Sequence, residues 1–175
     1  VLQGAVRVAR AMLVEKKSVL IHCSDGWDRT SQICALSQLL MDPYYRTFDG
    51  LLLSLSLSLS VCLSVSHTHT TGFLVSIQKD WLCYGHKFHR RVGQGSADYS
   101  DDQRSPIFIQ YLDCVWQLTR MYPLYFEFNE SLLVAIAHHL YSCRFGTFLF
   151  NNPREREHAK LDTKTTCLFT YLSSK

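Results

Sequence analysis

A cysteine and an arginine flank a short polar loop near the start of the chain. Residues 18–32 read SVLIHCSDGWDRTSQ, in which five residues separate Cys23 from Arg29. The backbone amides of such a loop, from Ser24 onward, form a phosphate-sized nest, and an arginine binds two phosphate oxygens with its planar fork. A helix that starts here adds the positive end of its dipole, which favours a bound anion and a thiolate. The pattern predicts a cysteine-dependent phosphatase with Cys23 as nucleophile.

The residues around Cys23 distinguish this pair from a second one with the same spacing. Cys114 and Arg120 also have five residues between them, in CVWQLTR, but this stretch has no glycine and follows a helical pattern in which no loop can form. Before Cys23, the apolar stretch VLIH predicts a strand, while Gly26 permits a tight loop and a helix follows. We therefore assign the chemistry to Cys23, and we expect Arg29 to stabilise charge on the transferring phosphoryl group.

Two aspartates within the loop are candidates for the general acid that a leaving alkoxide needs. These are Asp25 and Asp28. Carboxylates beside a thiolate and a phosphate repel, which is expected to raise a carboxyl pKa and keep a proton available. Alternatively, one of the two aspartates is the N-cap of the following helix. For Asp25 we consider this role and a functional role, in which it binds a ring of the substrate or orients a partner group, equally. Thr30 either donates a hydrogen bond to the cysteine sulfur or caps the helix, and Trp27 is expected to shape the pocket wall.

Apolar periodicity predicts the helices that hold this loop in place. Their ranges are 3–16, 31–41, 105–121 and 129–142. Asp42 and Pro43 are expected to end the second helix, because proline disfavours helical geometry in the residue before it. Ser105 and Asn129 are the expected N-caps of the last two. With the VLIH strand between the first two helices, the predicted fold class is α/β.

The composition is ordinary for a globular domain of 175 residues, with 47% hydrophobic residues and a net charge of +3. Such a charge suits contact with an anionic surface but does not by itself predict one. The seven cysteines have no paired spacing, which favours reduced thiols in a cytosolic compartment. His138 and His139 lack partners at ligand spacing, so we expect no metal site. The aromatic residues are interpreted as core rather than as a surface that stacks nucleic-acid bases.

Residues 51–71 break the pattern of the rest of the chain. They read LLLSLSLSLSVCLSVSHTHTT, in which leucine alternates with serine and then histidine with threonine. The segment is too polar to span a membrane. Translation through a CT dinucleotide tract gives alternating leucine and serine, and a CA tract gives alternating histidine and threonine. We interpret the segment as a low-complexity insertion that takes no part in the chemistry.

Several motifs outside the loop, taken together with it, resemble those of the myotubularin family. They are CSDGWDRT, DPYYRT at 42–47, DWLCYGHKF at 80–88, RSPIFIQYLDCVWQL at 104–118, FEFNE at 126–130 and HLYSCRFGTFLFN at 139–151. The resemblance implies that residues 1–175 form the C-terminal portion of a phosphatase domain with the α/β fold of protein tyrosine phosphatases, VLIH being the catalytic strand. A lipid-binding PH-GRAM domain and the first part of the phosphatase domain would lie upstream.

The resemblance also implies an activity, the removal of the 3-phosphate from phosphatidylinositol 3-phosphate and phosphatidylinositol 3,5-bisphosphate through a phosphocysteine, without a cofactor. Asp28 matches the family's general acid within the loop, while Ser24, Asp25, Gly26, Trp27 and Thr30 would contact substrate. Lys87 and Arg91 are four residues apart in GHKFHRRVG, so on a helix they would share a face. By resemblance they match basic positions that contact a second phosphate. A solvated basic face of a helix is the alternative interpretation of this pair.

Partners and location follow from the same resemblance. It implies a cytoplasmic protein at the surface of endosomal membranes, which binds a phosphoinositide and forms homo- or hetero-oligomers with other myotubularins; no nucleic-acid partner is expected.

Two other functions are considered for this sequence. A catalytically inactive adaptor is disfavoured because the cysteine, the arginine and both aspartates are present. A protein tyrosine phosphatase is disfavoured because the two loop aspartates and the Lys87 and Arg91 face suit an acidic headgroup.

Overall fold

The computed structural model describes residues 1–47, 72–94 and 102–173, and the insertion predicted at 51–71 lies outside these ranges. The regular elements of the described part are helical. The α-helices are α1 (Leu2–Leu13), α2 (Arg29–Met41), α3 (Gly72–Ile77), α4 (Phe88–Val92), α5 (Ile107–Met121), α6 (Glu130–Ser142), α7 (Pro153–His158), α8 (Leu161–Lys164) and α9 (Leu168–Ser173). A π-helix, η2 (Gln78–Cys83), continues α3, and three short 3-10 helices occur at η1 (Pro43–Arg46), η3 (Pro123–Tyr125) and η4 (Gly146–Phe148).

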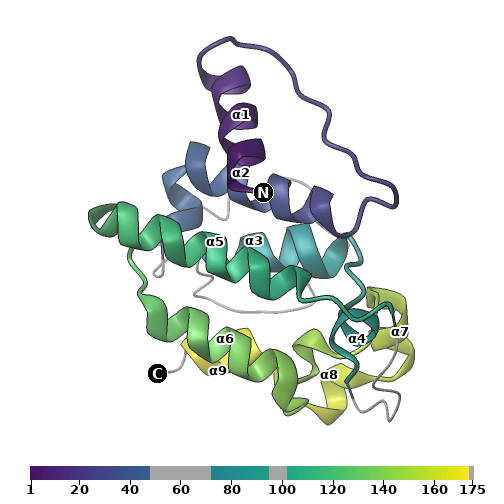
Figure 1. Cartoon of the computed structure of the whole chain (residues 1–175). Coiled ribbons are helices and arrows are strands. Elements are labelled where there is room, and N and C mark those ends of the chain that lie inside the picture. The colour runs from purple at the N-terminus through teal and green to yellow at the C-terminus, as the bar shows by residue number, and fades with distance from the viewer. Residues whose placement is uncertain (48–71, 95–101, 174–175) are drawn as a thin grey trace.

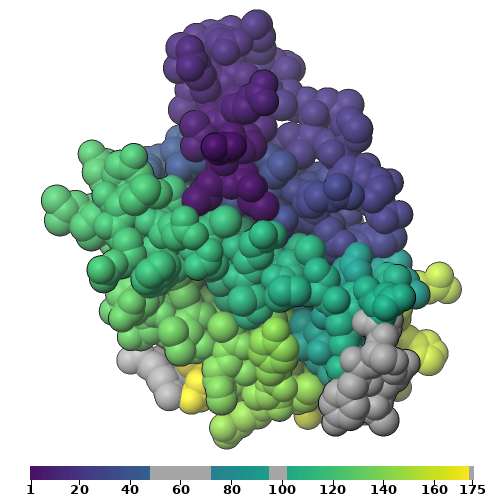
Figure 2. All heavy atoms as spheres, viewed as in Figure 1, coloured from purple at the N-terminus to yellow at the C-terminus, as the bar shows by residue number. Residues whose placement is uncertain are grey.

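The longer helices pack in sequence order along the molecule. α1 packs on α2, α2 on α5, and α5 on α6 (Figure 1). A long irregular connection leaves the end of α1 and enters α2 on the side of the molecule where α4 lies (Figure 1). In the space-filling view, α1 and this connection stand at one end of the molecule (Figure 2). No helix among the described residues is both long and apolar enough to cross a membrane.

The predicted α/β phosphatase fold is wrong for the described part of the chain, which contains no strand or sheet. The stretch VLIH, expected as the buried catalytic strand, is irregular, and its Leu20 side chain is 89% exposed. A strand forms only where a neighbouring extended segment pairs with its N–H and C=O groups. Residues 1–47, 72–94 and 102–173 supply no such neighbour, so the apolar composition of VLIH alone does not produce a strand.

The predicted helices are present, with differences at their ends. Helix 3–16 is found as α1, which ends at Leu13, and helix 31–41 is found as α2, which begins two residues earlier, at Arg29. Asp42 has extended backbone angles before Pro43, as predicted. Asn129 caps α6 by accepting a hydrogen bond from the Ser131 amide at 3.0 Å. The prediction of Ser105 as N-cap of α5 is wrong, because the helix begins at Ile107 with Pro106 in the N-cap position and no side-chain cap.

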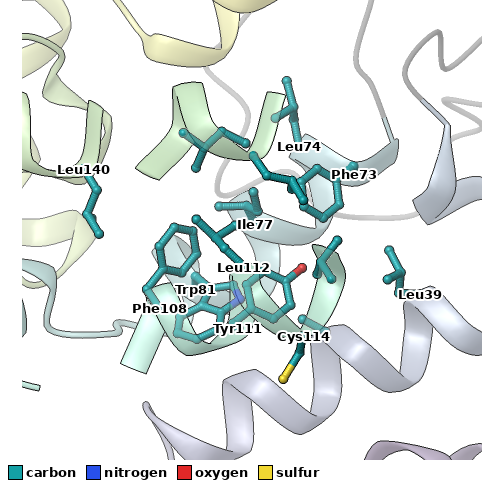
Figure 3. Close-up of a cluster of buried hydrophobic side chains, with 14 of the residues drawn as sticks. Leu39, Phe73, Leu74, Ile77, Trp81, Phe108, Tyr111, Leu112, Cys114 and Leu140 are labelled. Carbon is teal, nitrogen blue, oxygen red and sulfur yellow. The ribbon is translucent and has the colours of Figure 1, made fainter. Parts of the chain in front are cut away.

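The hydrophobic core includes an aromatic cluster between α5 and the segment formed by α3 and η2 (Figure 3). Trp81, fully buried in η2, meets the ring of Phe108 edge to face at 4.8 Å between centroids and that of Tyr111 at 5.0 Å. Edge-to-face aromatic pairs contribute beyond the area they bury, by about 0.5–1.5 kcal/mol each. The residues that follow Trp81 are thereby held against a rigid part of the molecule, and they lead directly to the candidate site.

Candidate active site

The predicted loop of residues 23–29 lies at the entrance to α2, and its backbone folds back over Cys23. Gly26 has a φ of +88°, which residues with a side chain rarely adopt, and open space surrounds the position of a Cβ there. This turn brings the Gly26 amide to 3.2 Å from the Cys23 sulfur. The predicted glycine-dependent loop is therefore present even though the strand before it is not.

Three hydrogen bonds hold the end of the loop and the first turn of α2 in place. The Ser31 hydroxyl donates to the Trp27 carbonyl at 3.1 Å, and the Gln32 side-chain amide donates to the Ile107 carbonyl at 2.9 Å. The same amide also donates to Gln110 at 2.9 Å, so the first turn of α2 is attached to α5. Because α5 is part of the core, the loop is carried by a well-packed element.

Cys23 has the electrostatics of a reactive thiol. Its partial burial acts to raise the pKa, but hydrogen bonds from the Thr30 hydroxyl and from the amides of Thr30, Gly26 and Asp25 outweigh burial and lower the pKa from 9.0 to about 6. The Thr30 hydroxyl is buried and makes no hydrogen bond to another oxygen or nitrogen of the described residues, so it does not compete with the sulfur for a different acceptor. At neutral pH this sulfur is mainly a thiolate, the form that attacks phosphorus.

Arg29 is exposed at the start of α2 and reaches back over the loop. Its Nη2 donates to the Ser24 hydroxyl at 3.2 Å, and that hydroxyl lies 3.3 Å from a carboxylate oxygen of Asp25. Ser24 follows Cys23 directly, so the guanidinium lies beside the residue next to the nucleophile. This position suits the predicted clamp on a phosphoryl group.

The Asp28 side chain contacts two side chains from outside the loop, those of Arg91 and His86. Arg91 donates to it from Nη2 at 2.5 Å and from Nε at 3.4 Å, while His86 Nδ1 lies 2.9 Å from Oδ1. Burial of the carboxyl acts to raise its pKa, but the hydrogen bonds and charges of His86 and Arg91 outweigh burial and lower it below 3.8. The prediction that crowding raises a carboxyl pKa is wrong for Asp28, because two cationic or donating partners face it.

The two basic residues predicted to share a helix face have different partners. Lys87 precedes α4 in the N-cap position, and its Nζ lies 3.7 Å from the centre of the Trp27 ring, a cation–π contact. Arg91, within α4, pairs with Asp28 and also donates to the Gln103 carbonyl at 2.7 Å. Both residues therefore contact the loop. Lys87 also borders a polar hollow of ≈ 510 Å³ with His89, Arg90, Gly93, Asn151, Asn152 and Glu155.

The lowered pKa of Cys23 predicts selective alkylation at mildly acidic pH. At pH 6.5 roughly three quarters of the Cys23 thiol would be ionised, against under about 1% of a thiol with a pKa of 9.0. Burial raises the pKa values of Cys34 and Cys114, so these two should stay unlabelled. Iodoacetamide labelling followed by peptide mass spectrometry measures this. Thr30→Val removes one donor and should shift the labelling midpoint to higher pH; equal labelling of all three cysteines contradicts the assignment.

Similarity to known proteins identifies the family of this chain. A family model of the myotubularin-like phosphatase domain matches residues 1–56 and 52–157. The chain belongs to this family of myotubularin-like phosphatases. A protein named myotubularin from Xenopus laevis is 45% identical over all 175 residues, which cover 25% of that relative. Two proteins named phosphatidylinositol-3,5-bisphosphate 3-phosphatase MTMR2, from Pongo abelii and Gallus gallus, are 44% identical over the whole chain, which covers 24% and 27% of them.

The myotubularin resemblance seen in the motifs is thus confirmed, and the chain spans about a quarter of the length of these relatives. The roles of the individual residues in this myotubularin-like domain stay predictions. One residue was missed from sequence, namely His86, which is fully buried against the loop. Its only sequence signal is that it lies within the DWLCYGHKF motif. Among the described residues, no three histidine, cysteine or carboxylate side chains are grouped as metal ligands would be.

Proposed function

We propose that this chain carries the catalytic loop of a phosphoinositide 3-phosphatase that acts on phosphatidylinositol 3-phosphate and phosphatidylinositol 3,5-bisphosphate. The observation that carries the proposal is the Cys23 thiol, whose pKa is lowered to about 6 by donors of the loop and Thr30. These same amides suit phosphate oxygens, and Arg29 lies at their edge. Membership of the myotubularin-like phosphatases supports a phosphoinositide as substrate.

In the first step, the Cys23 thiolate attacks phosphorus in line with the bond to the inositol oxygen. The S–P bond forms, the P–O bond breaks, and the leaving oxygen takes a proton from a carboxyl group. Asp28 is held as a carboxylate by His86 and Arg91, which disfavours it as the donor. Asp25 has no cationic partner among the described residues, so it is the better candidate for this proton.

In the second step, water attacks the phosphocysteine, and Cys23 leaves as a thiolate together with inorganic phosphate. A base must take one proton from the attacking water. The ionised carboxylate of Asp28 suits this task because it is already deprotonated at neutral pH. The step restores the thiolate; Asp28 then releases its proton to solvent and Asp25 takes one up from solvent, which completes the cycle.

Lys87 and Arg91 should have different effects on substrate preference. Lys87 borders the polar hollow, so Lys87→Met should lower kcat/KM for the bisphosphate roughly 10-fold more than for the monophosphate, the cost of about one charge-assisted contact. Arg91 holds Asp28, so Arg91→Met should lower both rates by the same factor. Phosphate release from vesicles that contain one or the other lipid measures both effects. Equal losses in Lys87→Met would contradict its role at the second phosphate.

The proposed function is tested by comparing substrates with the full-length chain. Phosphate release is measured from phosphatidylinositol 3-phosphate, phosphatidylinositol 3,5-bisphosphate and a phosphotyrosyl peptide. We expect both lipids to be hydrolysed with kcat/KM well above that of the peptide. A preference for the peptide would favour a protein tyrosine phosphatase, and lipid binding without release would favour an inactive adaptor. Action at endosomal membranes and oligomerisation with other myotubularins stay predictions.

A further inference from the structure

His86 is a fully buried histidine whose ring reaches the catalytic loop from a distant part of the chain. It lies between η2 and α4, 58 positions after Asp28 in the sequence. Its Nδ1 is 2.9 Å from Asp28 Oδ1 and 2.9 Å from the carbonyl oxygen of Trp27. We propose that His86 is a positioning residue, which holds the Asp28 carboxylate at the place where it accepts the proton of the water that hydrolyses the phosphocysteine. This inference rests on the proposed function.

The two acceptors determine which ring nitrogen carries the proton. A carboxylate oxygen and a backbone carbonyl oxygen both accept hydrogen bonds, so Nδ1 must be the donor to each. The buried Nε2 has no hydrogen-bond partner among the described residues. All of the hydrogen bonding of the His86 side chain is therefore directed at Asp28 and the loop backbone beside it.

The aromatic core fixes the direction of that donor. The His86 ring meets Trp81 edge to face at 4.8 Å between centroids and Phe88 at 4.7 Å, each at 83°. Its backbone amide donates to the Trp81 carbonyl at 2.9 Å, and its carbonyl accepts from the Phe88 amide at 2.9 Å. A side chain held by two neighbouring rings and at its backbone has little freedom, so it can position a partner precisely.

Arg91 contributes charge to Asp28, but it is placed differently from His86. It lies within α4, keeps 17% of its side chain exposed and divides its donors between Asp28 and the Gln103 carbonyl. His86 supplies a single donor from a fully buried ring. We therefore infer that Arg91 mainly keeps Asp28 ionised, while His86 fixes where its oxygens lie.

The test uses five variants of the full-length chain, one of them a control, with p-nitrophenyl phosphate as probe. His86→Leu removes the donor, and His86→Asn keeps an N–H group near the position of Nδ1. Asp28→Asn and the double variant His86→Leu with Asp28→Asn complete a cycle. His138→Leu, a change at an exposed histidine in α6, is the matched control. Rapid-mixing kinetics separate the burst, which reports phosphocysteine formation, from steady-state turnover, and thermal unfolding checks that each variant is folded.

We expect His86→Leu to lower kcat roughly 10- to 100-fold with an undiminished burst, because only the second step needs the positioned carboxylate. The double variant should be no slower than Asp28→Asn, and His86→Asn should regain most of the lost rate. If the burst and the steady-state rate fall by the same factor, or if the two losses multiply in the double variant, His86 does not act through Asp28. A folded wild-type chain that releases neither p-nitrophenol nor phosphate would overturn the proposed function, and this inference with it.

Discussion

Cys23→Ser is expected to lower kcat for phosphoinositide hydrolysis by at least ~10⁴-fold while binding of inorganic phosphate survives. The donors around the sulfur bring a thiol to a pKa of about 6, but a serine hydroxyl starts far higher and stays protonated in the same place. The amides and Arg29 that would bind the phosphate are untouched by the change. Phosphate release from lipid vesicles measures the first effect, and calorimetric titration with inorganic phosphate measures the second.

Cys114→Ser is the matched control for this experiment. Cys114 has the same spacing to Arg120 as Cys23 has to Arg29, but it is buried within α5, where burial raises its pKa. Its replacement should change kcat by less than about threefold, because a buried cysteine in a helix packs as a small apolar side chain. Wild-type turnover in Cys23→Ser would remove the nucleophile assignment, and so would an equal loss in Cys114→Ser.

Local sequence was sufficient to predict the loop and most helix boundaries. The turn at Gly26 depends on one residue's freedom to adopt positive φ, and the cap at Asn129 depends on one side chain and an amide two residues away. The end of α2 before Pro43 follows from the steric effect of proline on its neighbour. Each of these features is determined within a few residues, which is the range that sequence patterns describe well.

The strand and the N-cap of α5 could not be predicted in the same way. VLIH has the composition of a strand, but pairing partners decide whether it becomes one, and the described residues contain none. At Ser105 the capping side chain is of the right type, yet the following Pro106 takes the N-cap position itself. The strand and the cap were both predicted from residue type alone. Whether each one forms depends instead on how the neighbouring backbone is arranged.

The contacts that set the position and the pKa of the Asp28 carboxylate come from residues far from it in the sequence. Arg91 and His86 reach Asp28 because the aromatic core brings the start of α4 to the start of α2. The spacing of Lys87 and Arg91 predicted a shared helix face, but α4 begins only after Lys87. The direction of the Asp28 pKa shift therefore depends on packing, and it could not be inferred from the loop sequence alone.

Arg29→Lys is expected to lower kcat/KM roughly 10²- to 10³-fold, although the positive charge is kept. A lysine ammonium cannot hold two phosphoryl oxygens in one plane, so stabilisation is lost most where charge builds up in the transition state. Arg120→Lys in α5 is the matched control and should keep wild-type kcat/KM, since this arginine is exposed and faces the Trp116 ring at 5.9 Å. Kinetics on phosphatidylinositol 3-phosphate vesicles compare the two. If Arg29→Lys kept more than about a third of wild-type kcat/KM, charge alone would suffice, and the two-oxygen clamp would be wrong.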